Sequence, residues 1–387
     1  MLDRGFLSQE RPGSRPLNRL TKALILAALL PLFGCNRPAR QDVPVGYPRA
    51  YADLIDAAKG EGRLLIWSAI DARKAQALIA GFRRRYPLVR VDYVEMSAGQ
   101  VYTRYLAAVT ARKPGADLLW SSAMDLQIKL ANDGYAQQYA SPEAAHLPAW
   151  ANWKNQAWGT TAEPIVMVYN KKLIASAAMP GGHAALTNLL ERTPGALRGK
   201  IATYDLDQSA VGYLYLTQDQ EATPNLWRLV RAMGKNGVRL FPTAEGIMAD
   251  VAAGRSAIGY NIVGSYALEQ TEHNPNLGML VPRDYALLMS RLAVIPVTAS
   301  HPAAAKLFLD YLLSAEGQSF LAKARMPSVR SDVPSPAALR PADVRPRAIR
   351  VGPALLIGQD QLTHRYILRK WHKAIYGGAT PPDHRPD

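Results

Sequence analysis

The chain has 387 residues, of which 48% are hydrophobic and 20% are charged, and its formal net charge is +15. This length exceeds what one ordinary core needs and predicts two lobes, and the composition excludes a largely disordered chain. A basic balance suits nucleic acid, anionic lipid or an anionic ligand as partner.

The N-terminus carries an export pattern. A basic region precedes the apolar run ALILAALLPLFG, which extends from Ala23 to Gly34. This run is shorter than the roughly 20 residues of a membrane-spanning helix, and its basic flank favours a secretory signal peptide over a buried helix. We therefore expect residues 1–34 to be a signal peptide, which argues against a nucleic-acid partner. These residues hold five basic and two acidic side chains, so the mature chain keeps +12.

The end of the apolar run, LFGC, resembles a bacterial lipobox, whose cysteine is lipidated after cleavage. Cys35 is the only cysteine, so we expect a mature chain without a disulfide. Phe33 departs from the small residue usual before the glycine, so an incidental cysteine stays open as the alternative. We expect a periplasmic protein anchored through Cys35, with a proline-rich tether over residues 35–48.

The folded part is expected to begin near Tyr51 and to alternate strands with helices. Apolar or alternating runs predict strands at residues 64–67, 89–94, 117–120, 165–173, 199–205, 256–262 and 277–282. Amphipathic stretches predict helices at residues 51–62, 72–86, 100–112, 124–134, 184–192, 209–218, 224–236, 243–253 and 264–272. A further strand and a helix pair are predicted over 291–322. This alternation favours an α/β fold with an open, largely parallel sheet.

The C-terminal region, residues 336–387, differs from the rest. Its first part is rich in proline and arginine and predicts an extended wrap. A final helix follows, and we expect Leu362, Tyr366 and Trp371 to dock it on a lobe.

Small polar residues recur where predicted strands end and helices begin. Hydroxyl groups and free backbone N–H groups at the positive end of a helix suit an anion. Each residue taken alone is equally an ordinary helix cap, so the hypothesis depends on the recurrence. The candidate ligand-binding residues are Ser68, Asp71, Ser97, Ser121, Ser122, Thr160, Ser209, Gly264, Ser265 and Tyr266. Arg104, Arg255 and Arg291 could each add a charged contact or serve only as surface or lobe–lobe residues.

Several segments together resemble a known family. They include LLIWSAID, GADLLWSSAMDLQIKLANDGY, WGTTAEPIVMVYNKKL and DVAAGRSAIGYNIVGSYAL. In this order and spacing they resemble the type II periplasmic solute-binding proteins of ABC transporters, in the group that includes ferric-ion and phosphonate binders. The resemblance covers most of residues 50–325.

This resemblance implies a two-lobed periplasmic-binding-protein-like type II fold with a ligand cleft between the lobes. Residues 49–163 and 286–335 would form the first lobe and 164–285 the second, with crossovers near 163–170 and 285–292. It also implies a small solute and an ABC permease as partners, and we expect a monomer without a cofactor.

The ligand class remains the open question at this point. Ferric binders of the group carry adjacent tyrosines where this chain reads Gly264-Ser265, with only Tyr266 beside them. A single phenolate is a poor ferric site, so we expect no metal and an organic anion such as a phosphonate, a phosphate ester or a carboxylate. Ferric-iron transport and a receptor for a membrane sensor remain alternatives. A hydrolytic enzyme is another, although none of the common catalytic motifs occurs.

Overall fold

The computed structural model of the protein describes residues 43–192 and 195–377. The predicted signal peptide and Cys35 lie outside these residues. No helix among the described residues is both long and apolar enough to cross a membrane.

The first lobe is built on a six-stranded sheet in the order β2-β1-β3-β12-β5-β4. Its strands are β1 (Arg63–Ser68), β2 (Arg90–Glu95), β3 (Leu118–Ser121), β4 (Asn152–Trp153), β5 (Ala157–Gly159) and β12 (Leu292–Val294). Its helices are α1 (Tyr51–Glu61), α2 (Ala72–Arg85), α3 (Ala98–Thr110), α4 (Met124–Asn132), α10 (Pro302–Leu313) and α11 (Ala315–Lys323). Two short 3-10 helices, Pro142–His146 and Ala149–Ala151, precede β4.

The second lobe is built on a seven-stranded sheet in the order β13-β11-β6-β9-β7-β8, with β10 also paired to β6. Its strands are β6 (Glu163–Asn170), β7 (Ile201–Tyr204), β8 (Arg239–Phe241), β9 (Ile258–Val263), β10 (Leu277–Leu280), β11 (Ala286–Met289) and β13 (Pro346–Ala348). Its helices are α5 (His183–Arg192), α6 (Ala210–Ala222), α7 (Leu226–Lys235), α8 (Ala244–Ala252), α9 (Gly264–His273) and α12 (Gln361–Tyr376). The 3-10 turns Ser176–Ala178 and Ala337–Leu339 lie in connecting segments.

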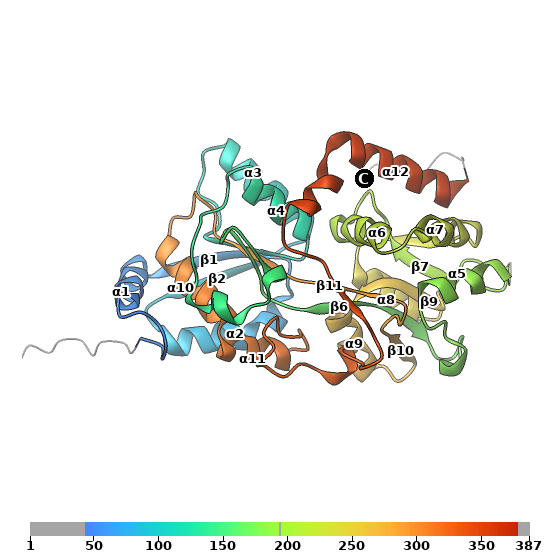
Figure 1. The fold of residues 1–387 in the computed structure, drawn as a ribbon, viewed down its shortest axis with the longest axis horizontal. Coiled ribbons are helices and arrows are strands. Elements are labelled where there is room, and N and C mark those ends of the chain that lie inside the picture. The colour runs from blue at the N-terminus through green and yellow to red at the C-terminus, as the bar shows by residue number, and fades with distance from the viewer. Residues whose placement is uncertain (1–42, 193–194, 378–387) are drawn as a thin grey trace, which may run out of the picture. The chain divides into compact units, whose positions relative to one another are not determined.

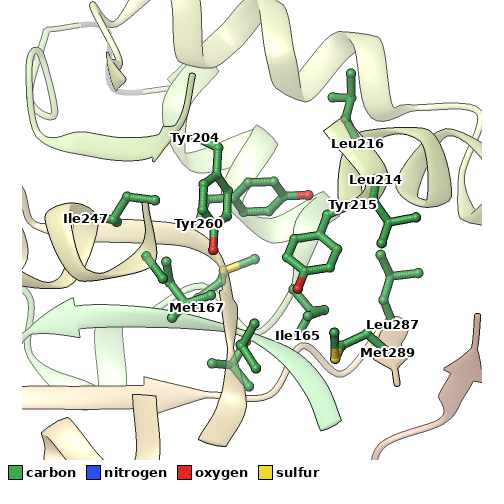
Figure 2. Packing of buried hydrophobic residues seen from close by; sticks show 14 of the residues in the cluster. Ile165, Met167, Tyr204, Leu214, Tyr215, Leu216, Ile247, Tyr260, Leu287 and Met289 are labelled. Carbon is green, nitrogen blue, oxygen red and sulfur yellow. The ribbon is translucent and has the colours of Figure 1, made fainter. Parts of the chain in front are cut away.

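The apolar run of β6 explains its central place. All eight of its residues are buried, as expected for a strand covered on both faces. Figure 2 shows the core around it, where Ile165 and Met167 of β6 lie near Tyr204, Tyr215 and Tyr260 of neighbouring elements. The second lobe therefore has one continuous core on which its helices are held.

Both sheets are mixed, whereas the strand–helix alternation predicted a largely parallel sheet. β1 is parallel to β2 and β3, but β12 is antiparallel to β3 and β5. In the second sheet β6 is antiparallel to β9, β10 and β11. The reversal arises because the strands that lead from one lobe to the other run against their neighbours, and such long-range pairing has no local sequence signal.

The chain passes between the lobes at two adjacent crossovers. One connects β5 to β6 through residues 160–162, and the other connects β11 to β12 through residues 290–291. Residues 286–289, expected in the first lobe, instead form β11 and pair with β6 and β13 of the second sheet. The two crossovers are hydrogen-bonded to each other, since Thr160 N–H donates to the Arg291 carbonyl at 2.9 Å.

The C-terminal segment touches both lobes, as an extended wrap would. β13 joins the second sheet, after which Val351 N–H donates to the Trp150 carbonyl of the first lobe at 2.8 Å. A 3-10 helix, η5 (Pro353–Gln359), then packs on α4, and Tyr213 of α6 donates to its Gly358 carbonyl at 2.6 Å. Figure 1 shows this segment in red leading to α12, which lies over α6 and α7.

The docking face of α12 differs in part from the predicted one. Trp371 is buried as expected, together with Ile367 and Ile375. Leu362 and Tyr366, which we expected to dock, are 76% and 55% exposed. They lie on the opposite side of the helix, because positions four residues before and after Trp371 share its face and theirs do not.

Candidate functional site

A cleft of about 470 Å³ lies between the lobes. The first lobe lines it with the segments that follow β1, β2 and β3, including Asp71, Ser97 and Ser122. The second lobe contributes the starts of α6, α8 and α9. This is where an open α/β sheet collects helix N-termini, beyond the carboxyl ends of its strands.

Four of the helices that begin at this cleft have a side-chain cap. The capping residues are Asp71 for α2, Ser97 for α3, Ser209 for α6 and Thr243 for α8, and all four line the cleft. Ser97 forms a full capping box with Gln100, which fixes the entry of α3. The caps of α3, α6 and α8 each accept from the N–H group of the third helical residue and do not bond the N–H groups of the first two.

Those earlier N–H groups belong to residues on the cleft wall. The first two residues of α3, α6 and α8 all line it: Ala98, Gly99, Ala210, Val211, Ala244 and Glu245. Backbone N–H groups in the first turn have no partner within the helix, and the helix dipole makes this end positive. Across the cleft α3 and α6 approach closely, since a Cβ on Gly99 would lie 4.0 Å from that of Ala210. Three positive helix ends from two lobes therefore converge on one space.

Five of the ten residues singled out from the sequence line this cleft: Asp71, Ser97, Ser122, Ser209 and Tyr266. The other five lie outside its lining, and their side chains are bonded inside the protein or absent. Ser68 donates to the Trp120 carbonyl at 3.0 Å, and Thr160 accepts from the Trp120 indole N–H at 2.8 Å. Ser121 accepts from Ala123 N–H at 3.3 Å. These hydroxyl groups position strand ends and the crossover.

Gly264 and Ser265 also serve packing. A Cβ on Gly264 would lie 2.8 Å from the Pro164 carbonyl oxygen, so only glycine lets α9 approach β6 this closely. Ser265 is fully buried and donates its hydroxyl proton to Glu163. We expected both residues at the cleft, but neither lies in its lining: Gly264 packs against Pro164 of β6, and Ser265 bonds Glu163.

The crossover holds a buried ion pair. Arg291 Nε donates to Glu163 Oε1 at 2.7 Å, and the two side chains are 1% and 0% exposed. Thr161 and Ser265 also donate to the Glu163 carboxylate. Burial by itself would raise the pKa of Glu163, but the charge and hydrogen bonds of Arg291 outweigh it and lower the pKa. Glu163 is therefore ionised, and the pair fastens one crossover to the other.

Arg291 is also the one candidate arginine at the cleft wall. Arg104 lies over the Trp67 ring, 4.6 Å from its centroid, and Arg255 pairs with Asp250 at 2.7 Å. Neither lines the cleft. Arg291 thus adds a partly neutralised positive group to the three helix ends.

Two tyrosines lie at the cleft. Tyr266 has Lys74 and Arg291 near its ring, at 5.1 and 5.2 Å from the centroid. Tyr215 of α6 is fully buried, and its hydroxyl group has no hydrogen-bond partner among the described residues. Figure 2 shows that hydroxyl directed toward Ile165 and Met289. Burial raises the pKa of both phenols, so both are neutral at ordinary pH.

Acidic side chains also line the cleft. Asp71 caps α2 and pairs with Arg73 at 2.9 Å, and Glu95 accepts from Ala72 N–H at 2.8 Å. Both therefore occupy the start of α2, which leaves α3, α6 and α8 open. Glu245 lies exposed in the first turn of α8. Among the described residues no group of three or more histidine, cysteine, aspartate or glutamate side chains is arranged to hold a metal ion.

Several lining residues were missed by sequence reasoning, namely Glu95, Gln208, Tyr215, Thr243 and Glu245. Thr243 carries a usable signal, because it is a small polar residue at the first position of the helix predicted over 243–253. The strand before it, β8, is only three residues long and was not predicted, so this strand–helix junction was not recognised.

Comparisons with known proteins agree with this geometry. The model of the family described as bacterial extracellular solute-binding protein matches residues 77–341. The solved substrate-binding protein of an ABC transporter from Agrobacterium tumefaciens is 36% identical, with a TM-score of 0.75 over 81% of this chain and 94% of that chain. No curated protein matches the chain.

Two more distant structures share the fold. AfuA from Actinobacillus pleuropneumoniae, a periplasmic binding protein with fructose-6-phosphate bound, is 18% identical, with a TM-score of 0.68 over 81% of this chain and 98% of that chain. Iron-bound HitA from Pseudomonas aeruginosa is also 18% identical, with a TM-score of 0.64 over 81% of this chain and 99% of that chain. At 18% identity these two structures show that the two-lobed fold is shared and nothing more.

Proposed function

Because the chain belongs to the bacterial extracellular solute-binding proteins of ABC transporters, we propose that it captures a small anionic solute in its interlobe cleft. Members of this family bind small solutes and work with membrane permeases, and they are transport proteins, not enzymes. The finer assignment, the anion, rests on the cleft of this chain.

The observation that carries the proposal is the convergence of three helix N-termini. α3 comes from the first lobe, α6 and α8 come from the second, and the first two residues of each helix lie on the cleft wall. Free N–H groups and aligned dipoles suit phosphate-like or carboxylate oxygens. The anion would complete its contacts only when both lobes are in place, so binding would favour the closed arrangement.

The acidic side chains of the cleft refine the expected solute. Asp71, Glu95 and Glu245 would repel a second anionic group. We expect a solute with one anionic group among the helix ends and an uncharged or cationic remainder turned toward these carboxylates. Fructose-6-phosphate and iron are bound by relatives of the same fold, so the fold by itself selects neither class.

We also propose that the protein is a periplasmic monomer anchored through a lipid on Cys35. The support is the LFGC sequence after a basic and apolar N-terminus. Intact-mass spectrometry of the membrane fraction would give the mass of a diacylated cysteine at the new N-terminus. A mature chain with an unmodified N-terminus would contradict the anchor.

The test of the anion site uses Gly99, the second residue of α3. Gly99→Asp places a carboxylate among the helix ends, where it stabilises α3 but repels an anion. Gly99→Asn has nearly the same shape without the charge and is the matched control. Titration calorimetry would follow an alkylphosphonate, its amino-bearing analogue, sugar phosphates, dicarboxylates and ferric citrate.

We expect at least one organic anion to bind the wild-type protein. Gly99→Asn should retain that affinity within a few-fold, and Gly99→Asp should weaken it at least tenfold, about 1.4 kcal/mol. Thermal unfolding of the two variants should be similar. Binding of ferric ion alone, or an affinity that Gly99→Asp leaves unchanged, would contradict the proposal.

A further inference from the structure

The positive net charge of the chain is not concentrated at the solute cleft. The lining of the cleft contains one arginine and three acidic residues, whereas the mature chain keeps +12. The clearest accumulation of positive charge lies elsewhere, on α7 and α12. Together these two helices carry seven lysine and arginine residues and no acidic residue: Arg228, Arg231, Lys235, Arg365, Arg369, Lys370 and Lys373.

These helices form one surface. They pack against each other, since a Cβ on Gly234 of α7 would lie 2.3 Å from the Ala374 carbonyl oxygen of α12. Lys370 also lies over the Trp227 ring of α7, 4.3 Å from its centroid. Figure 1 shows α12 outermost, over α6 and α7. The basic side chains on the outer sides of α7 and α12 therefore belong to one surface.

Most of this charge is not neutralised by neighbours. Arg228 pairs with Glu191, but none of the other six forms an ion pair among the described residues. The nearby acids are used otherwise: Asp207 contacts His372 at 2.7 Å, and Asp360 caps the start of α12. We call Arg231, Lys235, Arg365, Arg369, Lys370 and Lys373 the basic face.

Apolar side chains are exposed beside the basic face. Seven large hydrophobic residues are strongly exposed in the described chain, and three of them, Ile357, Leu362 and Tyr366, fall within ten residues of sequence. Leu362 and Tyr366 share the outer stripe of α12 with Arg365, Arg369 and Lys373, at helical spacings of three and four. An exposed leucine and tyrosine among cations is the arrangement that suits a lipid–water interface, where cations meet headgroups and apolar groups reach below them.

We propose that the basic face is a docking surface for anionic lipid headgroups. Clusters of four to eight basic residues are typical of segments that bind anionic bilayers. The surface lies apart from the solute cleft, because no residue of α7 or α12 lines it. Docking would hold the protein at the membrane that contains its permease, whether or not Cys35 is lipidated.

The experiment uses the full protein and two kinds of vesicle. One contains phosphatidylcholine alone, and in the other phosphatidylglycerol replaces part of it. Flotation should recover the protein with the anionic vesicles only, and high salt should release most of it, because ions screen charges beyond roughly 3 Å at 1 M. The variant Arg365→Glu/Arg369→Glu/Lys373→Glu should lower the bound fraction at least tenfold.

A matched control separates this surface from net charge. Arg49→Glu/Lys113→Glu/Lys172→Glu changes the net charge equally at exposed residues outside α7 and α12. This control should bind anionic vesicles nearly as the wild-type protein does, and both variants should keep their solute affinity. Equal losses in the two variants, binding to phosphatidylcholine alone, or no vesicle binding at all would overturn the proposal. In the last case the basic face would fit an acidic protein surface instead.

Discussion

Asp310 is a buried carboxyl group in the first lobe that responds to pH. It accepts hydrogen bonds from the hydroxyl groups of Tyr51, Tyr139 and Ser141. Burial raises its pKa to about 7, because the hydroxyl donors compensate only part of the lost hydration. Near neutral pH this group is therefore partly protonated in the folded state.

The sign of the linkage follows from the direction of this shift. The folded protein binds the Asp310 proton more tightly than the unfolded chain does, so this group contributes most stability below its unfolded pKa. That contribution is lost as pH rises from about 4 to about 7. Between pH 5 and pH 7 the loss amounts to about 2 kcal/mol.

Asp310→Asn should remove this dependence. We expect the difference in free energy of unfolding, variant minus wild type, to rise by about 2 kcal/mol between pH 5 and pH 7. Urea denaturation of both proteins at each pH measures this difference. Asp56→Asn, at an exposed residue, is the control and should show no such change. Parallel pH profiles of wild type and Asp310→Asn would contradict a raised pKa.

Single residues also show where sequence reasoning about the site reached its limit. Ser97, Ser209 and Thr243 are N-caps at the cleft, and Ser121 is an equally plausible polar residue after a strand. Ser121 nevertheless lies outside the cleft and bonds the chain beside it. A small polar residue after a strand can therefore cap a helix at the cleft or bond the chain beside it. The direction in which the strand ends decides which of the two it does.

At the scale of elements, α12 is held to the second lobe by one buried stripe. Trp371 is its largest member and is 2% exposed, but its indole N–H has no partner among the described residues. The indole therefore stabilises through packing and loses part of that gain to an unsatisfied donor.

Three substitutions on α12 should rank accordingly. Trp371→Ala should cost about 3 kcal/mol, the lower end for removing a large buried aromatic side chain. Trp371→Phe removes the unsatisfied donor along with some volume and should cost less than about 1.5 kcal/mol. Leu362→Ala should lie within about 0.5 kcal/mol of wild type. Chemical denaturation measures all three. A large effect of Leu362→Ala would contradict its place on the exposed side of α12, opposite the buried stripe.

At the scale of the whole molecule, the Glu163–Arg291 pair joins the two crossovers that connect the lobes. Such a pair is costly to bury, yet removing one member leaves an uncompensated charge in the interior. The pair fixes how the crossovers lie together, and Arg291 also lies in the lining of the cleft.

Breaking this pair should destabilise the protein. Glu163→Gln should lower the free energy of unfolding by about 3 kcal/mol, because it leaves the Arg291 guanidinium buried and unpaired. Glu163→Gln/Arg291→Met should recover part of that loss, and a double-mutant cycle by denaturation gives the coupling energy. The double variant should also bind the solute more weakly. Additive losses in the cycle would show that the pair does not act as a unit.

The sequence by itself determined the class of the protein and most of its elements. Alternating apolar and amphipathic runs are local signals, so the α/β pattern and helices such as α2, α3 and α8 follow from them. The segments typical of type II solute-binding proteins fixed the family, because their order is itself a sequence property.

Tertiary structure decided the rest. The mixed pairing of β6, β11 and β12, the return of the C-terminal segment to both lobes and the convergence of α3, α6 and α8 all join residues far apart in the chain. Contacts at that range depend on packing and strand direction, which no single stretch of sequence carries.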